Sequence, residues 1–143
     1  MENQIYNKIN LYQKTVIFSV LFTLVGFSYN VWRMEVSENN NNIRTASFEV
    51  LINLSSLEQL AYAAYYDENT TEGNPRKGWI TVGLIDDLSV LTNDKVKIKA
   101  TALRDVWSNN WEAMPTSQLA VDQIVGAIDS VRGEIKHLLS SLE

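Results

Sequence analysis

The sequence contains no cysteine and a single histidine, His137. Disulfides, thiol catalysis, a lipoprotein anchor and cysteine-ligated metal sites are therefore excluded. His137 lies near Glu134 and Lys136, two positions after a residue of the last apolar pattern, which favours a solvated or interfacial position. A single imidazole also has no second imidazole with which to share a metal ion or a catalytic step. We expect neither a cofactor nor a metal site.

Positive charge is scarce as well: 12 Lys and Arg residues stand against 17 Asp and Glu residues, for a net charge of −5. Nucleic-acid binding requires a basic face, so we expect no nucleic-acid partner. The sequence has no glycine-rich phosphate loop and no G-x-S-x-G motif. The adjacent acids Asp67-Glu68 and Asp86-Asp87 point in different directions on a helix and do not form a two-carboxylate site. We expect that the protein is not an enzyme.

Charge is missing altogether from the 18 residues between Thr15 and Trp32. At about 1.5 Å per residue a helix of this length spans about 27 Å, close to the ~30 Å hydrocarbon core of a bilayer. Tyr12 on one side, and Tyr29 with Trp32 on the other, are typical of membrane interfaces. We predict a transmembrane helix over residues 15–34, preceded by a short cytoplasmic segment over residues 1–14.

Two other interpretations of this apolar segment were weighed. A buried core helix normally carries a polar stripe with charges, which this segment lacks. A cleaved signal peptide needs a shorter apolar run and small residues before the cut, for which Gly26 and Ser28 are candidates. We expect an uncleaved anchor in the inner (cytoplasmic) membrane. Lys8 and Lys14 precede the helix and give its N-terminal side a slight excess of positive charge. Positive residues favour the cytoplasmic side, so we expect a single-pass topology with a periplasmic C-terminal domain.

Small and hydroxylated residues recur along the apolar segment at steps of four, four, three and four residues. They are Thr15, Ser19, Thr23, Gly26 and Asn30, called the anchor stripe below. On a helix they share one side, where a second helix can approach closely and form hydrogen bonds. Alternatively, the hydroxyls bond to their own backbone carbonyls. The amide of Asn30 favours a partner, so the anchor stripe is a candidate interface with an integral membrane protein or a second copy.

The residues after the anchor predict a helical domain. Residues 35–42 are polar and predict a spacer, or exposed turns of a helix that continues out of the membrane. Over residues 43–143 we expect helices from about 43 to 67, 78 to 91, 95 to 114 and 118 to the end, separated by loop residues such as Gly73, Pro75 and Pro115. The strand signal is poor. The fold class is therefore all-α, with an antiparallel bundle of about four helices; the alternative is three long helices with the second stretch docked obliquely.

Each expected helix has an apolar face. In the first it comprises Phe48, Leu51, Ile52, Leu54, Leu57, Leu60, Ala61, Ala64 and Tyr65. In the second it comprises Ile80, Leu84, Leu88 and Leu91, and in the third Val96, Ala100, Leu103, Trp107 and Trp111. In the last, steps of three and four form a heptad seam of Val121, Ile124, Ile128, Val131, Ile135, Leu138 and Leu142. Such faces are typical of bundle helices.

A second candidate site combines a basic pair with aromatic residues. Arg76 and Lys77 precede Trp79 at the start of a helix, where the helix dipole favours an anion. Trp107 and Trp111 lie one helical turn apart. These residues are a candidate patch for an anionic ligand or a partner's carboxylate. Alternatively, the tryptophans fill the end of the bundle and the basic pair is solvated.

Two functional hypotheses follow. The first is a non-enzymatic, membrane-anchored accessory or assembly subunit that acts through helix–helix contacts with a membrane protein partner. The alternative is an extracytoplasmic helical-bundle domain that senses a small anionic ligand and signals through a partner. The anchor stripe and the heptad seam favour the first, because both are surfaces suited to other helices.

Overall fold

A computed structural model describes the backbone of residues 2–142 and the side chains of residues 9–142. The chain forms four α-helices: α1 (Glu2–Tyr65), α2 (Pro75–Ser89), α3 (Asp94–Asn110) and α4 (Gln118–Ser141). No strand occurs among the described residues. The all-α prediction is confirmed. Lys8, which was used to orient the anchor, lies outside the described side chains.

The chain divides into two compact units, Met1–Asn39 and Asn40–Glu143. The first unit is helical over its described residues, and the boundary falls within the predicted spacer, residues 35–42. That segment is helical and belongs to α1. The interpretation of residues 35–42 as turns of a continuing helix therefore describes the local structure better than a non-helical spacer.

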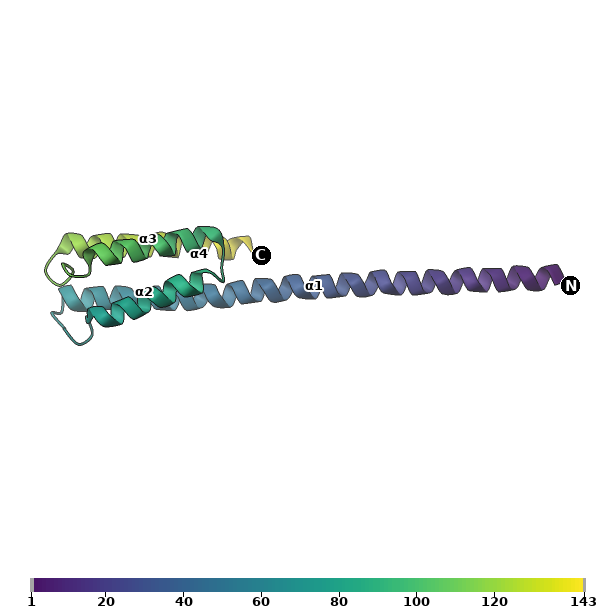
Figure 1. Cartoon of the computed structure of the whole chain (residues 1–143), viewed down its shortest axis with the longest axis horizontal. Helices are drawn as coiled ribbons and strands as arrows, with labels where there is room; N and C mark the ends of the chain where they lie inside the picture. Colours follow the sequence, from purple (N-terminus) through teal and green to yellow (C-terminus); the bar gives the residue numbers. More distant parts are fainter. Residues whose placement is uncertain (1, 143) are drawn as a thin grey trace. The chain divides into compact units, whose positions relative to one another are not determined.

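The second unit is an antiparallel four-helix bundle (Figure 1). Its helices are the C-terminal part of α1, then α2, α3 and α4, which run in alternating directions. The connections are short: residues 66–74, 90–93 and 111–117. Short connections place consecutive helices side by side, which is the topology expected of a simple up-and-down bundle.

Polar residues cap the three later helices. The side chain of Asn74 accepts a hydrogen bond from the Arg76 amide at 2.9 Å, and that of Asn93 accepts one from the Val96 amide at 2.8 Å. The Ser117 hydroxyl accepts one from the Ala120 amide at 3.3 Å. These bonds satisfy amides that have no partner within the helix. The breaks predicted at Asn93 and Ser117 are thereby confirmed.

The core of the bundle contains the apolar faces of α3 and α4 as predicted. In α3 the buried face is Val96, Ala100, Leu103 and Trp107. In α4 the residues of the heptad seam from Val121 to Leu138 are buried, and Leu142 is partly buried against them. The inner face of α1 consists of Val50, Leu54, Leu57, Ala61 and Ala64, which are all buried.

The predicted face of α2 was wrong for three of its four residues, whereas Leu88 is half-buried against the core as predicted. Ile80, Leu84 and Leu91 are 72 %, 43 % and 61 % exposed. The buried residues of α2 are instead Gly78, Val82, Ile85 and Ser89. Because Gly78 has no side chain, α2 approaches Trp107 of α3 closely at that point, and this contact turns the weaker apolar stripe inward.

The predicted face of the first bundle helix was too broad. Phe48 and Ile52 are 56 % and 59 % exposed. Leu51 and Tyr65 are half-buried against the core. In the bundle, α1 buries one narrow stripe and leaves a second apolar stripe at the surface.

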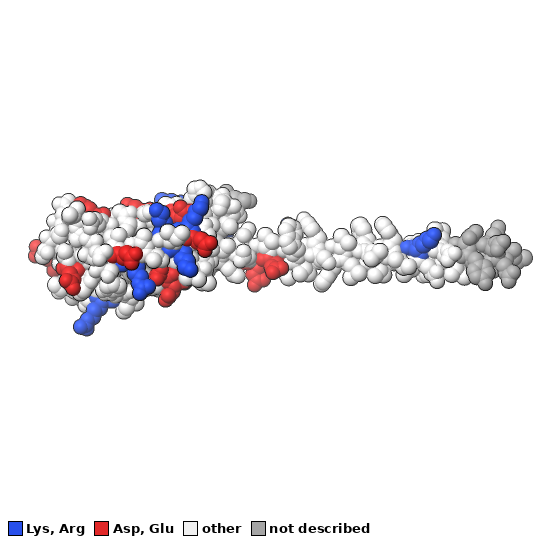
Figure 2. All heavy atoms as spheres, turned by 45° about the horizontal axis from the view of Figure 1, so that its top comes forward, with Lys and Arg blue, Asp and Glu red and all other residues white. Residues whose placement is uncertain are grey.

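Charged residues of both signs are interspersed over the visible face of the bundle (Figure 2). The first unit is uncharged over its apolar stretch in the same view. Taken by itself this unit is a lone helix, so large apolar side chains such as Phe18 and Phe22 are 68 % and 72 % exposed. Within the described residues, α1 is the helix that is long and apolar enough to cross a membrane.

Candidate functional site

The hydroxyl groups of the anchor stripe form hydrogen bonds within α1. The hydroxyls of Thr15, Ser19 and Thr23 donate to the carbonyl oxygens of Leu11, Thr15 and Ser19 at 2.9, 2.9 and 2.8 Å. This is the back-bonding arrangement that was weighed against an interface. These hydroxyls already have hydrogen-bond partners in α1. They therefore do not need a second helix to satisfy them in a membrane.

What remains of the anchor stripe is its shape. A Cβ atom placed on Gly26 would meet no atom within 4 Å. Since α1 is helical throughout, residues three and four apart lie on the same side, and Gly26 is bordered there by Thr23 and Asn30. The small residues of the anchor stripe thus form a shallow groove along α1, which the backbone of another helix can approach closely.

The structure brings the three tryptophans of the second candidate site together. The ring of Trp79 lies edge-on to the rings of Trp107 and Trp111, with centroid separations of 6.4 and 6.5 Å. Trp107 is fully buried, and its Nε1 has no hydrogen-bond partner. Trp79 is 36 % exposed. Edge-to-face packing of this kind stabilises a core, so the cluster is chiefly structural.

A glycine shapes this cluster. A Cβ atom on Gly78 would lie 2.2 Å from Cζ2 and 2.3 Å from Cη2 of Trp107. Carbon atoms cannot approach so closely, so the position requires glycine for the close contact between α2 and α3. The residue that precedes Trp79 therefore has a packing role that the sequence alone did not indicate.

The amides at the start of α2, beside the basic pair, are already bound within the chain. Pro75 has no amide hydrogen, and the amide of Arg76 is bound to the Asn74 side chain. The amides of Lys77 and Gly78 donate to the Asn74 carbonyl at 3.0 and 3.3 Å. The first turn thus offers no free amide of the kind that holds an anion.

The side chains of the basic pair are exposed. Lys77 borders a shallow depression that also contains the carboxylates of Asp67 and Glu72. Acidic neighbours offset the attraction of a lysine for an anion. The local charges therefore do not favour an anionic ligand beside Lys77.

A further surface emerges on the outer side of α1. Phe48, Ile52, Ser55, Gln59 and Tyr62 are all exposed, and we call them the outer seam. Together with Leu51, Ser56 and Glu58 they line a shallow groove of about 600 Å³. The groove is apolar along most of its length, because the hydroxyl of Ser55 on the outer seam and that of Ser56 at its border both donate to backbone carbonyls at 3.1 Å.

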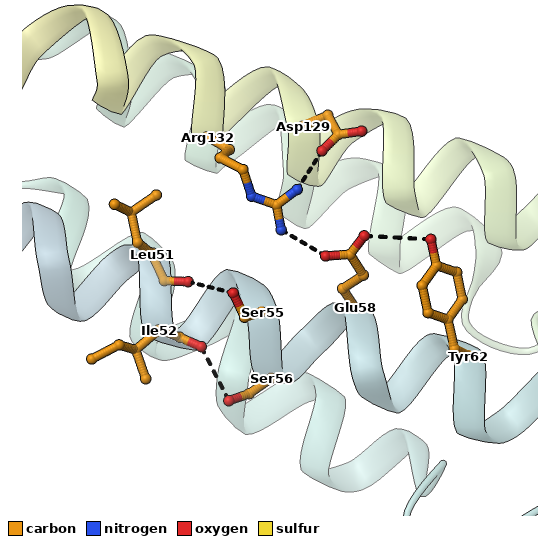
Figure 3. A network of polar contacts seen from close by, with 8 residues as sticks. All are labelled: Leu51, Ile52, Ser55, Ser56, Glu58, Tyr62, Asp129 and Arg132. Carbon is orange, nitrogen blue, oxygen red and sulfur yellow. Dashed lines mark hydrogen bonds and ion pairs between the residues drawn. The ribbon is translucent and has the colours of Figure 1, made fainter.

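One side of the groove is fixed by an ion-pair network between α1 and α4 (Figure 3). Arg132 donates one hydrogen bond to Glu58 at 2.6 Å and another to Asp129. The phenol of Tyr62 donates to the other oxygen of Glu58 at 3.4 Å. Charge-assisted bonds of this kind hold the edge of the groove in one geometry.

These contacts change two pKa values. Partial burial, followed by the negative charge of Glu58, raises the pKa of Tyr62. The hydrogen bond to Glu58 raises the pKa of Arg132 against the opposing effect of burial. Tyr62 is therefore a neutral phenol and Arg132 a cation at every ordinary pH.

The sequence contained a signal for the outer seam. Its members follow one another at steps of four, three, four and three residues, and so do those of the inner face of α1, from Val50 to Ala64. The sequence therefore contains two interleaved heptad patterns, which together look like one broad apolar face. Because the bundle covers only one of them, the other remains at the surface.

Acidic and histidine side chains are dispersed over the described part of the chain. Among residues 9–142, no group of three or more His, Cys, Asp or Glu side chains lies close enough together to hold a metal ion. His137 is exposed on α4. Comparison of the chain with protein-family models, with curated proteins and with solved structures found no match.

Proposed function

We propose that this protein is a non-enzymatic, membrane-anchored accessory or assembly subunit. Its apolar segment, residues 15–34, crosses the inner membrane once, and its helical bundle lies on the periplasmic side. It acts through helix–helix contacts with an integral membrane protein or with a second copy. The observation that carries the proposal is the uncharged stretch of α1, with open space for a neighbouring helix at Gly26.

The first part of the proposal is the anchor itself. A helix of 18 uncharged residues between Thr15 and Trp32 satisfies its own backbone hydrogen bonds in hydrocarbon. We expect the full chain to stay with the membrane after an alkaline carbonate wash, with its N-terminus intact. Recovery of soluble protein that begins near residue 28 would show that residues 1–28 are a cleaved signal peptide.

The second part is the use of the anchor stripe as an interface. Since the hydroxyls of Thr15, Ser19 and Thr23 already have backbone partners, close approach at Gly26 is the main contribution. Gly26→Leu places a side chain where two backbones need to meet, and it should weaken assembly. Membrane insertion should not suffer, because Leu is more apolar than Gly.

The matched control is Val20→Leu, an apolar change away from the anchor stripe. Both variants are compared by chemical crosslinking and by co-purification in native membranes. We expect Gly26→Leu to reduce the crosslinked or co-purified species and Val20→Leu to leave them unchanged. Equal assembly in both variants would remove the anchor stripe from the proposal.

A further inference from the structure

The outer seam of α1 is an unpartnered coiled-coil face. Its residues are spaced as in a heptad repeat, and its large members are exposed: Phe48 by 56 %, Ile52 by 59 % and Tyr62 by 39 %. The inner face of the same helix segment is fully used by the bundle core. A heptad face that remains at the surface is suited to a second helix, which would bury it by knobs-into-holes packing.

The outer seam has a low point on which such a helix can pack. Ser55 is small and stands between Ile52 and Gln59, so that another backbone can lie near α1 at this point. The hydroxyl of Ser55 is bound to the Leu51 carbonyl at 3.1 Å and needs no water on burial. Figure 3 shows this hydroxyl folded back onto α1.

We propose that the occupant is a second copy of this chain, with the two α1 helices packed in parallel along their outer seams. This inference rests on the proposed function in one respect: two copies anchored in the same membrane have the same orientation. In a parallel two-fold pair each seam residue faces its own counterpart. The occupant must then tolerate every self-contact along the seam.

The charge pattern meets this requirement. No residue of the outer seam is charged, so a parallel pair places no like charges opposite each other. Glu58, the acid that lines the groove, is already paired with Arg132 of its own chain at 2.6 Å. Gln59 facing Gln59 supplies both a donor and an acceptor, and a polar amide at one seam position favours a fixed register.

Cysteine crosslinking tests the proposal directly, because the native chain contains no cysteine. Ser55→Cys lies on the outer seam, and Ser56→Cys is the same substitution one residue away. Both serines are exposed and make the same bond to a carbonyl four residues earlier. A disulfide requires Cβ atoms about 3.5–4.5 Å apart, which seam positions approach and flanking positions do not.

The experiment uses the full chain in native membranes under mild oxidation. We expect a covalent dimer from Ser55→Cys and Gln59→Cys at several-fold higher yield than from Ser56→Cys. Equal yields from Ser55→Cys and Ser56→Cys would indicate random collision and overturn the proposal. Absence of dimer from all three variants would overturn it as well.

A second measurement compares Ile52→Glu with Ile98→Glu. Ile98 lies on α3, away from the outer seam, and is 66 % exposed, so the two substitutions carry a similar folding cost. In detergent-solubilised full chain, the mass from light scattering should fall from dimer to monomer only for Ile52→Glu. If Ile52→Glu instead releases a different protein and Ser55→Cys gives no dimer, that protein covers the seam and the second-copy proposal is overturned.

The two proposals fail separately. If a carbonate wash releases the protein but Ser55→Cys still forms the dimer, the membrane anchor is wrong and the paired seam stands. If the protein stays in the membrane and assembles through Gly26 without a Ser55→Cys dimer, the proposed function stands and the paired seam is wrong.

Discussion

Two glycines of α2 give a sharp test of how the bundle is packed. Gly78 and Gly83 lie in the same helix, but their surroundings differ. A Cβ atom on Gly78 would lie 2.2 Å from Trp107, whereas one on Gly83 would meet no atom within 4 Å. The same substitution, glycine to alanine, should therefore have effects of opposite sign on the free energy of unfolding.

The magnitudes follow from two effects. Alanine in a helix is favoured over glycine by about 0.5–1 kcal/mol. At Gly83 this effect acts alone and should stabilise the bundle, raising Tm by about 2–8 °C for a domain of this size. At Gly78 the methyl group forces apart two helices around Trp107, which is fully buried, at a cost of about 1–3 kcal/mol. The net result at Gly78 should be a loss of up to about 2.5 kcal/mol, or a Tm lower by up to about 20 °C.

The assay is thermal unfolding of the full chain in detergent micelles. Near-UV circular dichroism is the suitable signal, because Trp107 contributes to it through its packing against Trp79. The helical signal of the apolar segment does not interfere at these wavelengths. A rise in Tm for both Gly78→Ala and Gly83→Ala would refute the close contact between α2 and α3.

Two further predictions concern individual polar groups. Burial and then Glu58 raise the pKa of Tyr62 above 10.0, so the unfolded chain loses this proton first and stability falls as the pH rises from 10.0 through the raised pKa. Phenolate absorbance, with Tyr62→Phe as the blank, should show the midpoint moving towards 10.0 in Glu58→Gln; an unchanged midpoint would exclude Glu58 as a cause. Ser47→Ala should stabilise the bundle by about 1 kcal/mol, because the Ser47 hydroxyl is buried without a partner. Ser89→Ala should destabilise it by about 0.5–1.5 kcal/mol, because the Ser89 hydroxyl donates to the Asp86 carbonyl at 2.6 Å; denaturant unfolding that ranks these two variants in the opposite order would contradict both assignments.

The fold was predictable where a helix has one apolar stripe. In α4 the residues at steps of three and four, such as Ile124, Ile128 and Ile135, are fully buried. The apolar residues Val125, Ala127 and Leu139 border the same face, so the sequence pattern indicates one side of the helix. The breaks were predictable for a related reason. Asn93 and Ser117 cap helices through a local hydrogen bond, and local interactions are visible in local sequence.

The orientation of α2 was not predictable in this way. Its more apolar stripe, with Ile80 and Leu84, faces solvent, while Val82 and Ile85 face the core. What decides between them is the contact of Gly78 with Trp107, two residues that are far apart in the sequence. Counting apolar side chains favours the larger stripe, but a bundle selects the stripe whose shape allows the helices to approach.

The candidate sites also differ in how far the sequence could predict them. The tryptophans meet as expected, since Trp79, Trp107 and Trp111 lie at matching heights of adjacent helices. The anion hypothesis for Arg76 and Lys77 depended on free amides at the start of α2, and the cap residue Asn74 binds those amides. A sequence shows that a helix begins with basic residues, but it does not show which groups accept hydrogen bonds from the backbone amides of the first turn.

The outer seam illustrates why a helix with two apolar stripes is the hardest case. Each stripe alone would predict a buried face, and the sequence cannot say how many neighbours α1 has within one chain. The structure answers this: the bundle covers Leu54 and Leu57 and leaves Phe48 and Ile52 exposed. Exposed Phe and Ile at heptad spacing lower the solubility of a lone bundle, and the second helix proposed above would cover them. Because no member of the outer seam is charged and Glu58 beside it is paired with Arg132 of its own chain, a copy of the same helix can pack there without placing like charges opposite each other.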